Sequence, residues 1–101
     1  MEKYVLQKVY PLEQHEFEGR QGRQVIEVKG FLFTDGLNEI YAECVGTEAK
    51  VAEQNNYHEG EEVTAVFMFR HREYTDKNNM TRHSIDANVL RMARYRKVQV
   101  F

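Results

Sequence analysis

Several residue types that mark particular classes of protein are scarce in this chain of 101 residues. A single cysteine, Cys44, excludes an intramolecular disulfide and fits a reducing cytoplasm. One proline and six glycines leave no low-complexity segment. No apolar run approaches the ~20 residues that a membrane helix needs, and the first residues lack the apolar region of a signal peptide. These absences predict a cytoplasmic protein that does not contact membranes.

The composition that remains is that of one folded domain. Hydrophobic residues make up 42% of the chain and aromatic residues 12%, which is enough apolar surface for a core without disulfides. We expect a single domain over residues 1–101, with its core at about 4–93 and a tail at about 94–101.

Five β-strands and one short helix are predicted from the apolar pattern. Alternating β-branched and aromatic residues indicate strands at 4–12, 23–33, 38–45, 62–74 and 80–93. Thr47 is the expected N-cap of a helix that ends near residue 54, and Gly30 predicts a bulge or sharp bend in the second strand. The polar stretch 13–22 predicts a mobile loop, and 88–95 has a helical turn as its alternative. This order is typical of an all-β OB fold, a five-stranded, partly open Greek-key barrel.

The near-neutral net charge of −2 hides an uneven distribution along the chain. Residues 70–101 contain eight basic and three acidic residues, a net charge of +5, whereas residues 1–69 contain six basic and thirteen acidic residues, a net charge of −7. The C-terminal third is therefore the segment expected to attract a polyanion.

The first candidate binding surface is one face of the second strand. Alternation places Lys29, Phe31 and Phe33 together, opposite Val28, and Tyr41 is expected beside them on the third strand. Flat aromatic rings stack on nucleic-acid bases, and an interleaved lysine neutralises phosphate. The alternatives are that the two phenylalanines fill a core or a dimer interface, because an error of one residue in register exchanges the faces.

The second candidate is the hairpin between the fourth and fifth strands. It gathers bases and a tyrosine, namely Arg70, Arg72, Tyr74, Lys77 and Arg82, together with His71 and His83. Arginines and an aromatic ring on a protruding hairpin suit a phosphate backbone. The alternative is a solvated edge whose charges prevent pairing with other sheets.

Two further basic segments have weaker claims to a binding role. They are the loop with Arg20, Gln21 and Arg23, and the run Arg91, Arg94, Arg96 and Lys97. The loop follows three glutamates that would repel phosphate, and the run is either a basic surface or a frayed tail.

Catalytic and metal motifs are not found in the sequence. The four histidines, His15, His58, His71 and His83, do not have the spacing of a metal site. Cys44 alternates with apolar residues, which predicts a buried, inert thiol. No arrangement of nucleophile and base and no phosphate-binding glycine loop occurs. We expect no enzymatic activity, no cofactor and no metal.

Four stretches resemble small bacterial OB-fold proteins related to single-stranded-DNA-binding protein, a group that includes largely uncharacterised single-domain members. The stretches are KVYPL at 8–12, GRQVIEV at 22–28, GEEVTAVF at 60–67 and REY at 72–74. The likeness covers residues 5–92. It implies nucleic-acid binding on the face of the second and third strands and on the loops that join the first to the second and the fourth to the fifth strand.

These observations together predict a protein that binds single-stranded DNA or RNA with low sequence specificity. A basic groove would follow the phosphates and aromatic side chains would stack on the bases. The alternative is an OB-fold protein–protein interaction module that uses the exposed aromatic face as an interface. An oligosaccharide is a third ligand class, and a homodimer that covers this face stays open.

Overall fold

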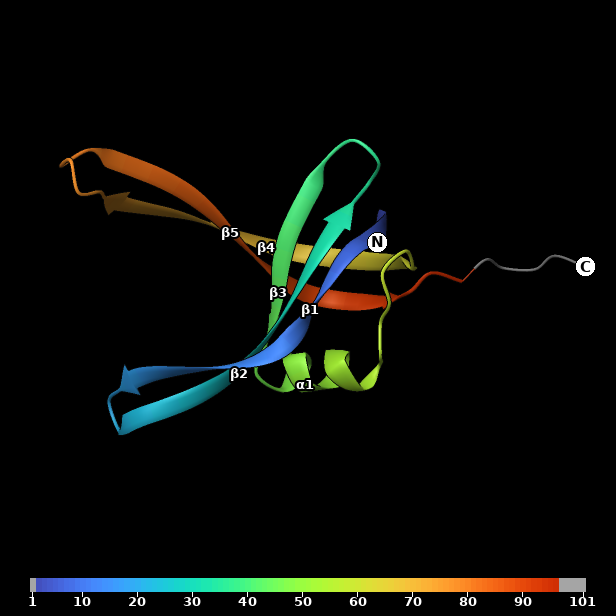
Figure 1. The fold of residues 1–101 in the computed structure, drawn as a ribbon, viewed down its shortest axis with the longest axis horizontal. Coiled ribbons are helices and arrows are strands. Elements are labelled where there is room, and N and C mark those ends of the chain that lie inside the picture. Colours follow the sequence, from blue (N-terminus) through green and yellow to red (C-terminus); the bar gives the residue numbers. More distant parts are fainter. Residues whose placement is uncertain (1, 97–101) are drawn as a thin grey trace, which may run out of the picture.

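Five strands and one helix make up residues 2–96, the part of the chain that the computed structural model describes. They are β1 (Glu2–Gly19), β2 (Gly22–Thr34), β3 (Glu39–Val45), α1 (Thr47–Gln54), β4 (Glu62–Thr75) and β5 (Thr81–Arg94). The strands follow one another around a closed barrel in the order β1-β2-β3-β5-β4 (Figure 1). The prediction of an all-β OB fold with one short helix between the third and fourth strands is confirmed.

The ring closes at two places of unequal strength. The start of β4 pairs antiparallel with the start of β1, with residues 62–65 opposite residues 2–5. Between β3 and β5, which run parallel, only Glu43 and Asn88 are in register. The ring is closed, and the β3–β5 join is the weaker of these two closures.

Two long hairpins extend from the same side of the barrel, β1 with β2 and β4 with β5 (Figure 1). The expectation of a mobile loop at 13–22 is wrong, because β1 continues through Pro11 and turns only after Gly19. Pro11 lies where the β1–β2 register shifts between Val9 and Leu12. A proline is tolerated at such an irregularity because its missing N–H breaks no regular ladder bond.

The β4–β5 hairpin ends in a short loop that Asp76 organises. Its carboxylate accepts hydrogen bonds from the backbone N–H groups of Asn78 and Met80 at 2.9 and 3.0 Å, and from Arg82 Nε at 2.7 Å. The bond from Arg82 and the two backbone bonds lower the pKa of Asp76. After this loop β5 is a strand as far as Arg94, so the helical turn considered for 88–95 does not form.

The core is built from aromatic and small residues that face into the barrel. Phe31, Phe33, Leu6 and Val63 are its largest fully buried side chains. Phe33 packs edge-on against Phe67, with ring centroids 4.9 Å apart. The interpretation of Phe31 and Phe33 as an exposed stacking platform is therefore wrong, and the alternative of a core holds. They are the large apolar side chains whose burial contributes most to stability.

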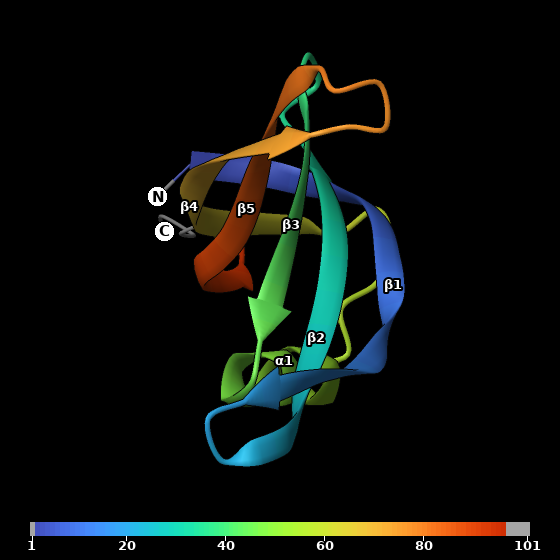
Figure 2. The ribbon, with the colours of Figure 1, turned by 90° about the vertical axis from the view of Figure 1, so that its left-hand side faces the viewer.

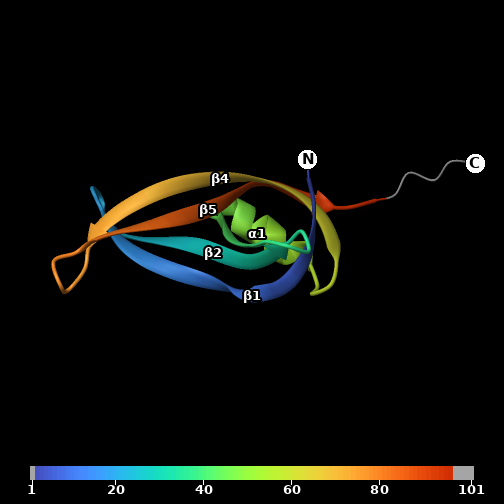
Figure 3. The same ribbon diagram turned by 90° about the horizontal axis from the view of Figure 1, so that it is seen from above.

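Helix α1 covers one end of the barrel (Figures 1 and 3). Its small residues Ala49 and Ala52 are buried in the same core as the strands. The residue before the helix is Gly46, whose φ of 68° lies in the left-handed region, and no side chain caps the helix. The prediction of Thr47 as N-cap is wrong by one position, because glycine accepts a positive φ without a Cβ clash.

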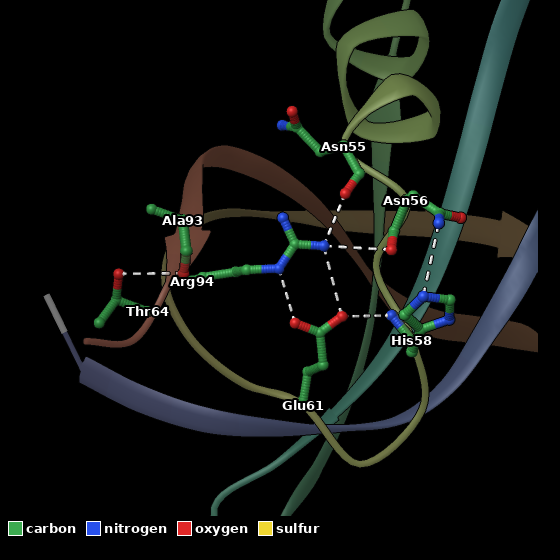
Figure 4. Close-up of polar contacts among 7 residues, drawn as sticks. All are labelled: Asn55, Asn56, His58, Glu61, Thr64, Ala93 and Arg94. Atoms are coloured by element: carbon green, nitrogen blue, oxygen red, sulfur yellow. Dashed lines mark hydrogen bonds and ion pairs between the residues drawn. The ribbon is translucent and has the colours of Figure 1, made fainter. Parts of the chain in front are cut away.

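Arg94 ties the loop after α1 to the end of the barrel (Figure 4). Its Nε donates to Glu61 Oε2 at 2.7 Å, and its guanidinium donates to the carbonyl oxygens of Asn55 and Asn56 at 2.6 and 3.1 Å. The guanidinium also lies 4.7 Å from the centroid of the Tyr57 ring. The assignment of Arg94 to a tail is wrong, because its side chain is held by structural contacts.

Arg94→Ala is expected to lower the melting temperature and to make it less sensitive to acid. The hydrogen bond from Arg94 holds the pKa of Glu61 below its ordinary value of 4.5. The pair therefore contributes stability above about pH 4.5 and loses it as the pH falls through the lowered pKa. Arg94→Lys keeps the charge but not the planar guanidinium, so its melting temperature should lie between those of the parent and of Arg94→Ala. Thermal melts across this pH range test the prediction, and equal acid sensitivity in the parent and Arg94→Ala would contradict it.

Candidate functional site

The exposed face of β2 and β3 lies between the two hairpins. Figure 2 looks at this face, with β2 and β3 in the centre, the β4–β5 hairpin above them and the β1–β2 hairpin below. The helix lies at the end of the barrel and leaves the face uncovered. A ligand on this face would meet both hairpins, which is where OB folds bind oligonucleotides and oligosaccharides.

Two tyrosines form an aromatic pair on this face, which we name the tyrosine platform. The rings of Tyr10 on β1 and Tyr41 on β3 meet edge to face, with centroids 5.6 Å apart. Tyr41 is 49% exposed. The pair reaches across β2 because Gly30 lies beneath the Tyr41 ring: a Cβ at Gly30 would lie 2.8 Å from Tyr41 Cε2. Gly30 thus provides close approach for a ring. The irregularity predicted at Gly30 lies on its β1 side, where the β1–β2 register shifts between Val9 and Leu12, whereas the β2–β3 register is regular.

The Tyr41 hydroxyl is held as a hydrogen-bond donor. It donates to Glu43 Oε2 at 2.8 Å. Burial, this hydrogen bond and the negative charges of Glu43 and Glu13 raise the pKa of Tyr41 to about 12. The hydroxyl therefore stays protonated at neutral pH, and it orients the Glu43 carboxylate.

A polar cleft of about 490 Å³ lies beside Tyr41, between β3 and β5. We name it the β3–β5 cleft, and it is lined by Tyr41, Glu43, Arg72, Ile85, Asp86, Ala87 and Asn88. It lies at the weak join of the barrel, where Asn88 Nδ2 donates to the Glu43 carbonyl oxygen at 3.4 Å. The cleft has aromatic, cationic, anionic and amide groups within reach of one small ligand.

The outer face of the β4–β5 hairpin continues from the cleft. Cross-strand pairing places Arg72 beside Ser84 and Tyr74 beside Arg82, so these side chains share one face. Arg72 Nε lies 3.3 Å from Ser84 Oγ and 3.6 Å from Asp86 Oδ2, and its guanidinium lies 5.8 Å from the Tyr74 ring centroid. The hairpin is therefore an arginine and tyrosine surface whose charge is partly balanced by acids.

The opposite face of the hairpin carries two exposed apolar side chains, a pair of histidines and Glu73. Phe69 is 55% exposed and Ile85 is 73% exposed, and both continue the inward-facing side of the barrel strands. His71 Nε2 and His83 Nδ1 share a hydrogen bond at 2.7 Å, with the rings stacked 4.9 Å apart. Exposed apolar side chains in a continuous stripe are typical of an interaction surface.

The structure brings together most of the predicted hairpin residues and separates the rest. Arg70, Arg72, Tyr74 and Arg82 alternate onto one face of the hairpin, and Lys77 lies in its loop. Tyr41 lies across the β3–β5 cleft from Arg72. These are the predicted residues that share one surface.

Lys29 does not belong to that surface. It is buried, and its Nζ lies 2.7 Å from Glu53 Oε2 on α1. Its role as a phosphate contact is wrong, because its strand position turns it into the barrel with Phe31 and Phe33. A buried lysine needs such a partner, since an isolated charge in the interior is very costly.

The two minor basic segments lie apart from one another. Arg20 and Gln21 form the turn between β1 and β2, and Arg23 pairs with Glu16 across the hairpin. At the other end, Arg91 and Arg94 belong to β5, and Lys97 lies outside the described residues. The prediction of a tail that begins at residue 94 is therefore wrong at its start, because β5 runs through Arg94.

Sequence reasoning missed Tyr10 and the two cleft residues Glu43 and Asn88. Tyr10 lay inside the predicted first strand, but alternation from Tyr10 onward puts it on the opposite face from Glu13. The register shift between Val9 and Leu12, which the sequence does not show, changes the face at this point. Glu43 was visible as an outward residue of its strand, but only the β3–β5 pairing shows that it borders a cleft.

The remaining reactive groups do not form a catalytic or metal centre among residues 2–96. Burial raises the pKa of the Cys44 thiol to about 11, which keeps it protonated and unreactive. In this part of the chain no three His, Cys, Asp or Glu side chains gather closely enough to bind a metal ion. Nor does it contain a helix with the length and apolar character required to span a membrane.

Comparison with known proteins gives no family, so the class of this protein is defined by its fold and its exposed surface. No protein-family model matches the sequence, and a search of curated proteins finds no match. The geometry defines the class: an OB-fold barrel whose exposed face carries a tyrosine platform, a polar cleft and an arginine-bearing hairpin.

Proposed function

We propose that this OB-fold protein binds single-stranded nucleic acid, DNA or RNA, with little sequence preference. The observation that carries the proposal is the open face between the two hairpins, with Tyr10 and Tyr41 at its centre and the outer arginines of β4–β5 at its border. Every base has a flat surface that stacks on an aromatic ring, so such a platform tolerates many sequences. Arginines bordering it can pair with the phosphates.

The placement of charge supports a particular course for the strand. Glu13 and Glu43 surround the platform and would repel phosphates. Arg70, Arg72 and Lys77 lie on the hairpin and would attract them. A single strand therefore fits best with its bases over β2 and β3 and its backbone along the β4–β5 hairpin.

Oligonucleotide affinity is expected to fall steeply with salt and to depend on the hairpin. Each phosphate neutralised contributes a slope of about −0.7 to a plot of log affinity against log salt. Arg72→Ala with Lys77→Ala should weaken binding to all sequences alike and make the slope shallower by about 0.7 for each phosphate that is no longer neutralised. Fluorescence anisotropy with a labelled oligo-dT over a salt series measures both quantities.

A matched control for the hairpin variant removes two positive charges from a surface away from the β4–β5 hairpin. Lys3 pairs with Glu62 and Lys50 pairs with Glu27, both away from the hairpin. Lys3→Ala with Lys50→Ala should bind with the parent's salt slope. Absence of binding at low salt, or an affinity independent of salt, would refute the proposal.

A protein-interaction role is the second candidate, and the exposed stripe of Phe69 and Ile85 favours it. In this role the stripe would be the interface, either with another protein or with a second copy in a homodimer. The resemblance of the sequence to bacterial relatives of single-stranded-DNA-binding protein favours the nucleic-acid role, and the single free cysteine, Cys44, fits a reducing cytoplasm. Sedimentation of the parent and of Ile85→Ser distinguishes a dimer from a monomer.

A further inference from the structure

The β3–β5 cleft has a chemistry that a sequence-tolerant binding face does not require. Two carboxylates, Glu43 and Asp86, line it together with the amide of Asn88. Its cation, Arg72, already lies 3.6 Å from Asp86. A cleft of this composition does not attract phosphate, because uncompensated carboxylates repel it.

The same carboxylates are well suited to a nucleobase. An ionised carboxylate only accepts hydrogen bonds, and it can accept two at once through its two oxygens. Single-stranded bases expose their Watson–Crick edges to such groups. Guanine has two adjacent donors on that edge, the N1–H and the N2 amino group, whereas thymine has one N–H between two carbonyl oxygens that a carboxylate repels.

Glu43 is the better placed of the two carboxylates. The Tyr41 hydroxyl donates to its Oε2 at 2.8 Å, which orients the carboxylate beside the tyrosine platform. Asn88 donates to the backbone carbonyl of Glu43, which fixes the strand at this point. A base stacked on Tyr41 would therefore place its edge toward a carboxylate that is already oriented.

We propose that the β3–β5 cleft binds a guanine base, with Tyr41 beneath its ring and Glu43 accepting from its N1–H and N2 amino groups. Asp86 lines the same cleft and is a second carboxylate that can accept hydrogen bonds from the base. The inference rests on the proposed binding of single strands, and it adds one preferred base to an otherwise sequence-tolerant surface. The volume of about 490 Å³ accommodates a base together with its water.

The test compares oligo-dT with oligo-dT in which isolated thymines are replaced by guanine, at one fixed salt concentration. Guanines are kept apart so that they do not associate with one another. A well-formed pair of hydrogen bonds to a base edge discriminates by about tenfold, so the parent should bind the guanine oligonucleotide about tenfold more tightly. Inosine lacks the N2 amino group, and its substitution should remove most of the gain.

Variants connect the preference to the cleft. Glu43→Gln should abolish the preference for guanine and raise the affinity for oligo-dT, because a charge that repels phosphate is removed from beside the tyrosine platform. Glu39→Gln is the matched control: it lies on the same face of β3, outside the cleft, and should keep the preference. Asp86→Asn should reduce the preference.

The outcomes separate the two proposals. Equal affinity of the parent for oligo-dT and for the guanine oligonucleotide would overturn the guanine site and leave single-strand binding intact. A preference that persists in Glu43→Gln would also overturn it, since the base would then be read elsewhere. No binding of any oligonucleotide at low salt would overturn the proposed function and the guanine site together.

Discussion

Phe31→Ala is expected to lower the free energy of unfolding by about 3–5 kcal/mol. Phe31 is fully buried, and its ring centroid lies 5.9 Å from that of Phe33 and 5.8 Å from that of Tyr57. Truncation leaves a cavity that the surrounding barrel fills only in part, because protein interiors are close-packed. Denaturant unfolding followed by circular dichroism measures the loss.

The control for this prediction is the exposed phenylalanine of the hairpin. Phe69→Ala should cost about 1 kcal/mol or less, as expected for a surface position. The folded fraction of Phe31→Ala should bind oligonucleotides with the parent's affinity, because its ring does not reach the outer face. A Phe31→Ala protein with parental stability and impaired binding would show that the ring is a stacking surface after all.

Tyr41→Ala is expected to weaken oligonucleotide binding by about 1–3 kcal/mol, and Tyr10→Ala by a similar amount. Both rings lie on the outer face, so the melting temperature should change little. Tyr41→Phe keeps the ring and loses only the hydrogen bond to Glu43, so it should retain most of the affinity for oligo-dT. Anisotropy titrations of the three variants give the comparison.

Gly30→Ala provides an independent check of the platform. The added Cβ would meet the Tyr41 ring, and the ring would have to swing toward solvent. Binding should therefore weaken in Gly30→Ala although no tyrosine is removed. Parental affinity in both Tyr41→Ala and Gly30→Ala would exclude the tyrosine platform as the base-binding surface.

Much of the fold was predictable from local patterns. Alternation along β3 and β4 gave those strands almost at their observed bounds, because β3 and the first half of β4 have one buried and one more exposed face, and alternation of residue types continues along the exposed second half of β4. A short helix ending near residue 54 was predicted because Gly46 ends the preceding strand and two alanines give the helix an apolar side, although the helix starts one residue earlier than expected.

The inner face of β2 could not be chosen from the sequence. Both of its faces carry large apolar residues, with Phe31 on one and Leu32 on the other. Alternation separates the two faces but does not say which one points inward. Lys29 made the inner face look like the outer one, and only the position of Glu53 on α1 explains how a lysine is accommodated there.

The candidate site depended on contacts between distant segments. The tyrosine platform joins β1 to β3 across Gly30, and the β3–β5 cleft joins Tyr41 to Arg72. Single residues such as Tyr41 and Arg72 were predictable because exposed aromatic and basic residues are common in binding surfaces. Their partners were not, because pairing between β3 and β5 is a property of the closed ring.

The join between β3 and β5, which we call the seam, has a single residue pair, whereas the neighbouring strands β1 and β2 pair along most of their length. Separating the strands there sacrifices few backbone hydrogen bonds, whereas separating β1 from β2 breaks a long ladder. Amide protons along the seam should therefore exchange with solvent before those of the β1–β2 ladder. A barrel with such a seam can widen locally to admit a bulky group and close again while its core stays intact.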